Sequence, residues 1–348
     1  MIMWTLTIVS VLGSYWMSRG YRNHKKVFLW LAGIAIVLIM GSRYFINGFT
    51  DEITYNYEYE GYRNWSFERV KHELSKDRDW GFTLFYWGLA KIFPWRQFPI
   101  YFITAFFIFA AFRFIYYNLE ETLIPVLLIL AFDIFTFYMA GYRQCFSMCF
   151  CLFAFEFAKK NKFVPFLLLW LIAISMHISA YIFFPVYWLI KIKGTASWKI
   201  WILVVVAMMF LSRLLMEYAA EIFAREDYIE RKEFSLMGFF VQVMIMAVPI
   251  IFTIFGVCEK NGKNDALLWL MIIGLIFYLS KFVYFSFERL SYYYTFFTIG
   301  AFSQSVSSLR QKDEYDKTRS NIKGIICVTL IVLAFLRIPI GLNFFWNY

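Results

Sequence analysis

Long apolar runs alternate with short charged segments along the whole chain. An α-helix needs about 20 apolar residues to cross a bilayer, and the clear runs of about this length are 1–18, 27–46, 98–117, 123–140, 144–158, 198–216, 239–257, 266–286, 290–307 and 324–346. The stretch 81–93 is short for a span, and 163–190 is too long for one span and too short for two. The pattern predicts a polytopic membrane protein with some broken or re-entrant helices.

Composition supports lipid as the surrounding solvent. Of the 348 residues, 61% are hydrophobic and 17% are charged, whereas soluble domains average about 45–50% apolar and about 25% charged residues. The net charge of +10 comes from Lys and Arg in short loops, which is typical of helix orientation in membranes and not of nucleic-acid binding. The five cysteines lie within or beside apolar runs and are expected to pack in the core. The sequence predicts one all-α membrane domain over residues 1–348, with roughly 10–12 transmembrane helices.

The charged loops also predict an orientation. Segment 19–26 holds four basic residues and no acid, which indicates the cytoplasmic side. The segments 47–80 and 217–238 are then external, and within the second the amphipathic stretch 217–235 predicts a surface helix. Stretch 163–190 becomes a hairpin of two short helices with His177 at its external tip. Successive loops can alternate between the two sides of the membrane only if 81–93 does not fully cross, or if one loop with basic residues lies outside. The sequence leaves both alternatives open.

The unusual polar residues gather on the external side of this topology. Ionisable groups at membrane depth are costly and usually face a cavity or a partner. Several on one side therefore predict a water-filled site that opens outward, and they are Asp51, Glu52, Asp79, Asp133, Arg143, His177, Glu288 and Arg289.

Each candidate has a functional and a structural interpretation. Arg143 and Arg289 begin apolar helices, where a guanidinium and a helix N-terminus both favour phosphate, but either residue alone also fits an interfacial anchor. His177 is a candidate general base or a hydrogen-bond donor to a substrate. Its structural interpretation is a histidine that only forms a hydrogen bond to a neighbouring helix. Asp51 is a second candidate base.

The start of the external segment suits sugar recognition. Carboxylates flanked by aromatic rings, here Asp51 and Glu52 with Tyr55, Tyr57 and Tyr59, can bind sugar hydroxyls and stack on sugar faces. The alternative is a solvated acidic loop with interfacial tyrosines. Asp77-Arg78-Asp79 resembles the Asp-x-Asp pattern of metal-dependent sugar transferases, but three residues in a charged loop are weak evidence for a metal. No phosphate-binding glycine loop or Ser-His-Asp pattern is present in the sequence.

Together these short motifs resemble the EpsG family, which is related to Wzy-type O-antigen and capsule polymerases. The motifs, in chain order, are Arg43, Thr50-Asp51 with Tyr55, Asp79-Trp80-Gly81-Phe82, Arg143-Gln144, His177-Ile178-Ser179-Ala180 with Pro185 and Tyr187, and Arg289 with Tyr292 to Tyr294. Glu52 stands where the family usually has an aromatic residue. The order and spacing across most of the chain, more than any single motif, carry the resemblance.

The resemblance implies a C-type membrane glycosyltransferase-like fold and a polymerase of lipid-linked repeat units. The glycan would leave polyprenyl pyrophosphate and join a hydroxyl of the next unit, at the outer face of the bacterial cytoplasmic membrane. No metal or other cofactor is expected, and a chain-length regulator is a candidate partner protein. In this interpretation Asp51 or His177 is the base, Arg143 and Arg289 bind pyrophosphate, and the substrate-binding residues are Glu52, Tyr55, Asp79 and Tyr292. Alternatives are a flippase for lipid-linked sugars, an O-antigen ligase, which shares the donor, and a glycan acyltransferase.

Overall fold

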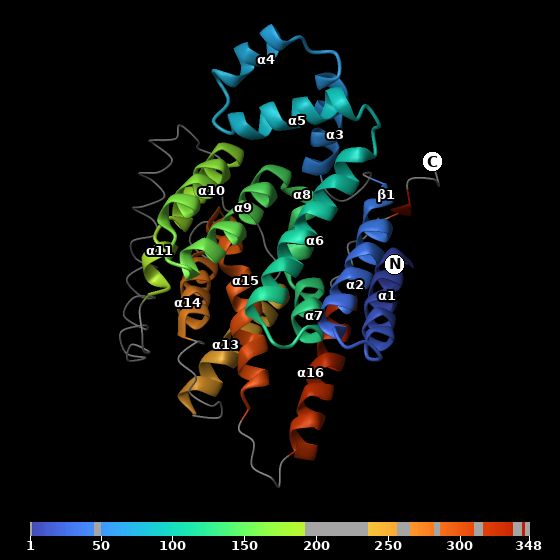
Figure 1. The fold of residues 1–348 in the computed structure, drawn as a ribbon, viewed down its shortest axis with the longest axis vertical. Coiled ribbons are helices and arrows are strands. Elements are labelled where there is room, and N and C mark those ends of the chain that lie inside the picture. The colour runs from blue at the N-terminus through green and yellow to red at the C-terminus, as the bar shows by residue number, and fades with distance from the viewer. Residues whose placement is uncertain are drawn as a thin grey trace. The chain divides into compact units, whose positions relative to one another are not determined.

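The computed structural model describes residues 2–44, 50–191, 236–255, 265–281, 286–309, 316–336 and 343–344 (Figure 1). The predicted span 198–216 and the predicted surface helix 217–235 lie outside these residues. Contacts divide the chain into two compact units, Met1–Phe184 with Lys317–Tyr348, and Pro185–Asp316. The prediction of a single domain stays a prediction.

The first unit is helical apart from two short strands. Its helices are α1 (Ile2–Ser18), α2 (His24–Gly41), α3 (Thr50–Tyr62), α4 (Phe67–Leu74), α5 (Trp80–Ile92), α6 (Phe98–Asn118), α7 (Leu123–Ala131), α8 (Asp133–Ala140), α9 (Tyr142–Lys159), α10 (Phe163–Met176), the 3₁₀ helix η1 (Ile178–Phe183) and α16 (Asp316–Leu336). Strands β1 (Arg43–Tyr44) and β2 (Asn343–Phe344) pair antiparallel. The second unit contains α11 (Val186–Leu189), α13 (Leu236–Ile254), α14 (Asp265–Ser280) and α15 (Ser286–Ser307), with α14 packed along α15.

Helices α1, α2, α6, α9 and α10 pack in that order, each against the next (Figure 1). Helix α2 shows why this layer suits a membrane. Phe28 and Ile36 are buried against neighbouring helices, while Trp30 and Leu38 are 62% and 59% exposed. A helix that is apolar on its exposed face as well as its buried face needs an apolar solvent.

Two described helices are long and apolar enough to span a membrane, His24–Gly41 and Phe98–Asn118. A third span is possible if the pair α7 and α8 is counted as one helix bent by 56° at Phe132. Shorter apolar helices cover further predicted runs, including Ile2–Ser18 and Phe163–Met176. The helical membrane architecture is therefore supported, whereas the predicted number of roughly 10–12 spans stays a prediction.

Three predicted elements change in detail. The run 27–46 ends as a helix at Gly41, because the chain turns there into β1. The run 123–140 is interrupted at Phe132. The predicted external segment 47–80 is largely helical, because α3 and α4 occupy most of it. The described cysteines 145, 149, 151 and 327 are free, and the first three are buried, as expected for packing residues.

Candidate active site

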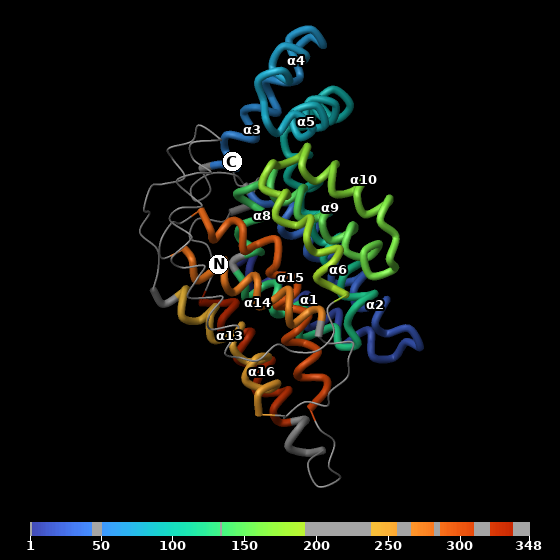
Figure 2. Tube along the Cα trace, turned by 90° about the vertical axis from the view of Figure 1, so that its left-hand side faces the viewer, coloured from blue at the N-terminus to red at the C-terminus, as the bar shows by residue number. Residues whose placement is uncertain are grey.

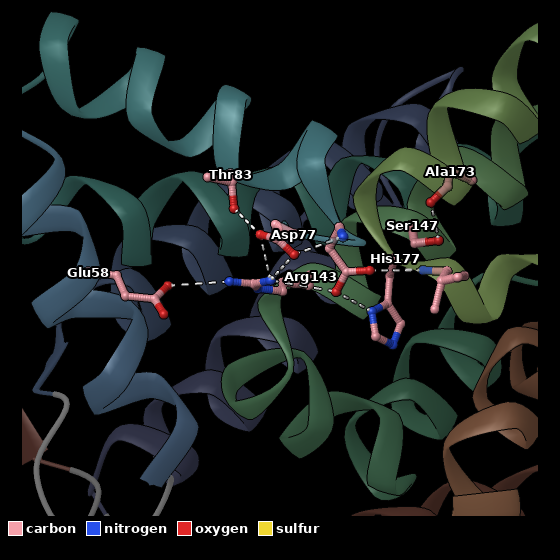
Figure 3. A network of polar contacts seen from close by, with 9 residues as sticks. Glu58, Asp77, Thr83, Arg143, Ser147, Ala173 and His177 are labelled. Carbon is pink, nitrogen blue, oxygen red and sulfur yellow. Dashed lines mark hydrogen bonds and ion pairs between the residues drawn. The ribbon is translucent and has the colours of Figure 1, made fainter. Parts of the chain in front are cut away.

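The described structure pairs His177 with Asp79, two residues that are 98 positions apart. His177 directly follows α10 and has an extended backbone (φ −159°, ψ 124°), so the helix ends there. Its Nδ1 lies 2.9 Å from Oδ2 of Asp79, the residue before α5. The backbone N–H of Ile178 donates to the other carboxylate oxygen over 3.0 Å. Asp79 therefore fixes both the position and the orientation of the imidazole (Figure 3).

In this orientation Nε2, the second ring nitrogen of His177, is available to accept a proton. A carboxylate can only accept, so Nδ1 donates and Nε2 holds the lone pair in neutral His177. In Figure 3 no dashed line reaches the second ring nitrogen of the labelled His177, and no described residue is hydrogen-bonded to it. The His177 side chain is 19% exposed. An aspartate that orients a neutral imidazole in this way is a suitable arrangement for a general base.

The charge state of Asp79 supports this arrangement. Burial alone would raise the pKa of Asp79, but the hydrogen bond and charge of His177, the Ile178 N–H and the charge of Arg143 outweigh it, and the net effect lowers the pKa. Asp79 is therefore ionised at neutral pH and can stabilise an imidazolium when His177 gains a proton.

Arg143, the second residue of α9, lies among three carboxylates. Its Nη1 is 3.2 Å from both oxygens of Asp77 and 3.7 Å from Asp79, and its Nη2 is 3.7 Å from Glu58. Its guanidinium carbon lies 5.2 Å from the centre of the Phe82 ring. The side chain is 22% exposed. One cation shared among three acids leaves this cluster with a net negative charge.

Two neighbours complete the cluster. Asp77 accepts a hydrogen bond from the Thr83 hydroxyl over 2.5 Å and another from the Asp79 backbone N–H over 2.9 Å. Burial raises the pKa of Glu58, and the charge of Arg143 offsets only part of that effect. Glu58 therefore holds a proton more readily than an ordinary glutamate.

A second, fully buried ion pair is linked to the cluster through Tyr142, the residue before Arg143. Arg43 donates from Nε and Nη2 to Oε1 of Glu52 over 3.0 and 2.6 Å, and the side chains are 0% and 1% exposed. The Tyr142 hydroxyl donates to the same oxygen over 2.7 Å. The ring of Tyr55 stacks on Tyr142, with centres 4.8 Å apart and an angle of 5°. Tyr142 directly precedes Arg143, so its hydrogen bond to the Arg43–Glu52 pair anchors the start of α9.

The second unit has a buried ion pair of its own. Lys281 Nζ donates to Glu288 Oε1 over 2.8 Å, and both side chains are nearly buried. Arg289 is the fourth residue of α15 and is exposed, while Tyr292 is buried. Arg289 thus lies at a helix start, as predicted. Whether it shares a site with Arg143 stays a prediction.

Sequence comparison now identifies the family. The model of the EpsG family matches residues 6–348. This chain belongs to the EpsG family. No curated protein and no solved structure matches the chain. Together with the apolar helices, family membership points to a membrane protein of polysaccharide biosynthesis, in a glycosyltransferase-like polymerase family.

In this EpsG-family protein, three residues that the sequence singled out meet in one place: Asp79, Arg143 and His177. Asp51 lies in the first turn of α3, is exposed, and makes no hydrogen bond or ion pair with a described residue. Asp133 begins α8, but its side chain is not among those described. The catalytic and binding roles assigned to these residues stay predictions.

Sequence reasoning did not single out Glu58. The alternation of Tyr55, Tyr57 and Tyr59 drew attention to the wrong period, because α3 is a helix. Tyr57 is 62% exposed, whereas Tyr59 is buried and donates to the Phe93 carbonyl over 2.7 Å. Helical spacing from Tyr55 would have placed Glu58 on the same face and marked it as a candidate.

Asp77 and Asp79 already have side-chain partners within the protein. Asp77 binds Arg143 and Asp79 binds His177, so the Asp-x-Asp motif has protein partners in this structure. Within the described segments, no group of three or more His, Cys, Asp or Glu residues is arranged to hold a metal ion.

Proposed function

We propose that this EpsG-family protein is a polysaccharide polymerase. It transfers a polyprenyl-pyrophosphate-linked glycan chain to a sugar hydroxyl of another lipid-linked repeat unit, at the outer face of the cytoplasmic membrane. The observation that carries the proposal is the Asp79–His177 pair, which is a base held at 2.9 Å by its orienting carboxylate. A hydroxyl acceptor needs such a base because it is a weak nucleophile until its proton is removed.

The proposed step moves one proton and one electron pair. His177 Nε2 takes the proton from the acceptor hydroxyl as its oxygen bonds to the anomeric carbon of the growing chain. The bond from that carbon to the pyrophosphate oxygen breaks, and lipid pyrophosphate leaves with the electron pair. Asp79 stabilises the imidazolium that forms. His177 and Asp79 thus act on the acceptor side of the reaction.

Arg143 is the proposed link to the pyrophosphate. Its contacts with Asp77, Asp79 and Glu58 span 3.2–3.7 Å, longer than the about 2.7–2.9 Å of a strong charge-assisted bond. Arg43, by contrast, binds Glu52 at 2.6 Å. Because these contacts are weak, the N–H groups of Arg143 can exchange their carboxylate partners for a phosphate oxygen. There they would stabilise the charge that develops as the leaving group departs. The three acids oppose this role by repelling phosphate, so Arg143 needs a separate test.

The central experiment is polymerisation by the purified protein, reconstituted in liposomes with a lipid-linked repeat unit. His177→Ala is expected to lower the rate of product-ladder formation about 100-fold or more, the usual contribution of a general base. Asp79→Asn should lower it by a similar factor. His72→Ala is the matched control, because His72 is 64% exposed on α4 and lies outside the cluster. A wild-type ladder from His177→Ala, or transport of the repeat unit without any product, would overturn the proposal.

The arginines are tested in the same assay. Arg143→Ala and Arg289→Ala are each expected to abolish long products while the protein still inserts into membranes. Arg22→Ala is a control for loss of one positive charge, since Arg22 is exposed in the turn between α1 and α2, outside the cluster. Unchanged ladders from the two test variants would remove their assignment to pyrophosphate.

A further inference from the structure

Helix α5 has one exposed stripe and one buried face. Trp80 and Leu84 are 50% and 37% exposed, and Lys91 is also exposed. These positions follow the helical spacing i, i+4, i+11 and so lie on one side of the helix. The opposite side holds Phe82 and Tyr86, both 1% exposed or less. The exposed stripe therefore combines large apolar side chains with a positive charge.

The length and direction of α5 do not suit a membrane span. Its 13 residues extend about 20 Å, whereas the hydrocarbon core is about 30 Å thick. Within the first unit, α5 lies across the end of the layer formed by α6, α9 and α10 (Figure 1), and it is seen nearly end-on in the view turned by 90° (Figure 2). Since α6 is a candidate span, a helix across its end runs close to the membrane plane.

The surroundings of α5 favour the interface between lipid and water. Phe67 of α4 is 61% exposed, and its ring lies 5.9 Å from that of Trp87. Lys91 Nζ lies 6.0 Å from the centre of the Trp87 ring and donates to the Arg63 carbonyl. Between residues 63 and 96 the sequence has seven Lys or Arg and four Asp or Glu. Trp and basic side chains together are typical of the headgroup region.

We propose that α5 and the exposed start of α4 lie in the plane of the membrane, with Trp80, Leu84 and Lys91 in the headgroup region of the bilayer. The occupant of this surface is thus the lipid interface itself. The hydrocarbon core would leave Lys91 without water, and water alone would leave the apolar stripe exposed. This position also accounts for the charge pattern, because 81–93 then does not cross.

The position has a consequence for the site. Asp79 directly precedes α5, so a helix at the interface holds the Asp79–His177 pair at headgroup depth. If the proposed function is right, this is the depth at which the pyrophosphate of a lipid-linked sugar lies. The membrane position of α5 itself does not depend on that function.

The test measures depth along the helix. Nitroxide labels are attached one at a time at positions 80, 84, 88 and 91 of the full chain, through a genetically encoded ketone side chain that leaves native cysteines in place. Position 88 suits a label because a Cβ at Gly88 meets nothing within 4 Å. In liposomes, the ratio of collisions with oxygen and with a water-soluble nickel complex reports depth. An in-plane helix gives depths that agree within a few ångströms, close to the headgroups.

A matched series on α6 gives the opposite expectation. Ala105, Phe109 and Tyr116 are exposed on one side of α6 and span the same 11 residues, which correspond to about 16 Å of depth in a crossing helix. A gradient of that size along α5 would overturn the proposal, and so would labels that all report bulk water. Because the readout is depth, the result stands whether or not His177→Ala abolishes polymerisation.

Discussion

Glu52→Ala distinguishes a structural carboxylate from a substrate ligand. The substitution leaves Arg43 charged, 0% exposed and without its acid partner. Removing one partner of a buried ion pair typically costs about 3–5 kcal/mol, a large part of the about 5–15 kcal/mol that stabilises a folded domain. The lost hydrogen bond from the Tyr142 hydroxyl adds about 1 kcal/mol. We expect a large fall in the unfolding temperature in mild detergent.

The controls separate charge loss from packing. Glu58→Ala removes an acid that is 32% exposed and 3.7 Å from Arg143, so its cost should be well under 1 kcal/mol. The double variant Arg43→Met/Glu52→Leu should regain much of the stability, because it leaves no buried charge unpaired. If Glu52→Ala unfolds at the wild-type temperature and yet forms no polymer, the reasoning is refuted and Glu52 is a substrate ligand, as the sequence first suggested.

Three further results are expected. Burial raises the pKa of Glu58 above its ordinary 4.5, so ionisation of Glu58 disfavours the folded state. The free energy of unfolding of the wild type should therefore fall relative to that of Glu58→Gln as pH rises above about 4.5. A difference between the two proteins that stays constant across pH would contradict this linkage. Gly81→Ala places a Cβ 2.6 Å from the Ser175 Cβ and 2.9 Å from its backbone carbon, so it should separate α5 from α10 and lower polymerisation at least tenfold, while Gly88→Ala, which has free space, should not. Polymerisation should survive a chelator, and a loss rescued by a divalent ion would assign a metal to Asp77 and Asp79.

The apolar pattern predicted helices where a run had clear polar ends. The run 98–117 corresponds to α6, Phe98–Asn118, because a proline and charged residues mark its start and Asn118 its end. The break at Phe132 escaped prediction because residues 123–132 are almost uniformly apolar. In such a stretch, hydrophobicity cannot indicate where the backbone bends, and tertiary contacts decide it.

Several residues of the candidate site could be singled out from the sequence, whereas their pairing could not. His177 and Asp79 stood out because ionisable groups beside apolar runs are costly. Their contact depends on the close approach of α5 to α10 at Gly81 and Ser175, and sequence periodicity carries no information about such an approach. Glu58 was missed because the tyrosines after Asp51 were interpreted as an alternating pattern, whereas α3 places residues at helical spacing.

The two ion clusters of the first unit differ in burial and in how tightly their charges are paired. Arg43 and Glu52 are buried and in contact at 2.6 Å, and such a pair fixes structure because neither partner can leave without a large cost. Arg143 is 22% exposed, with contacts of 3.2 Å and longer, so under the proposed function its partners can change when a substrate enters. Tyr142 joins the clusters, since its hydroxyl binds Glu52 and its backbone continues into Arg143. In the proposed reaction, the rigid Arg43–Glu52 pair would keep Arg143 in place without using up its hydrogen-bond donors, as a residue that binds charge only as it develops requires.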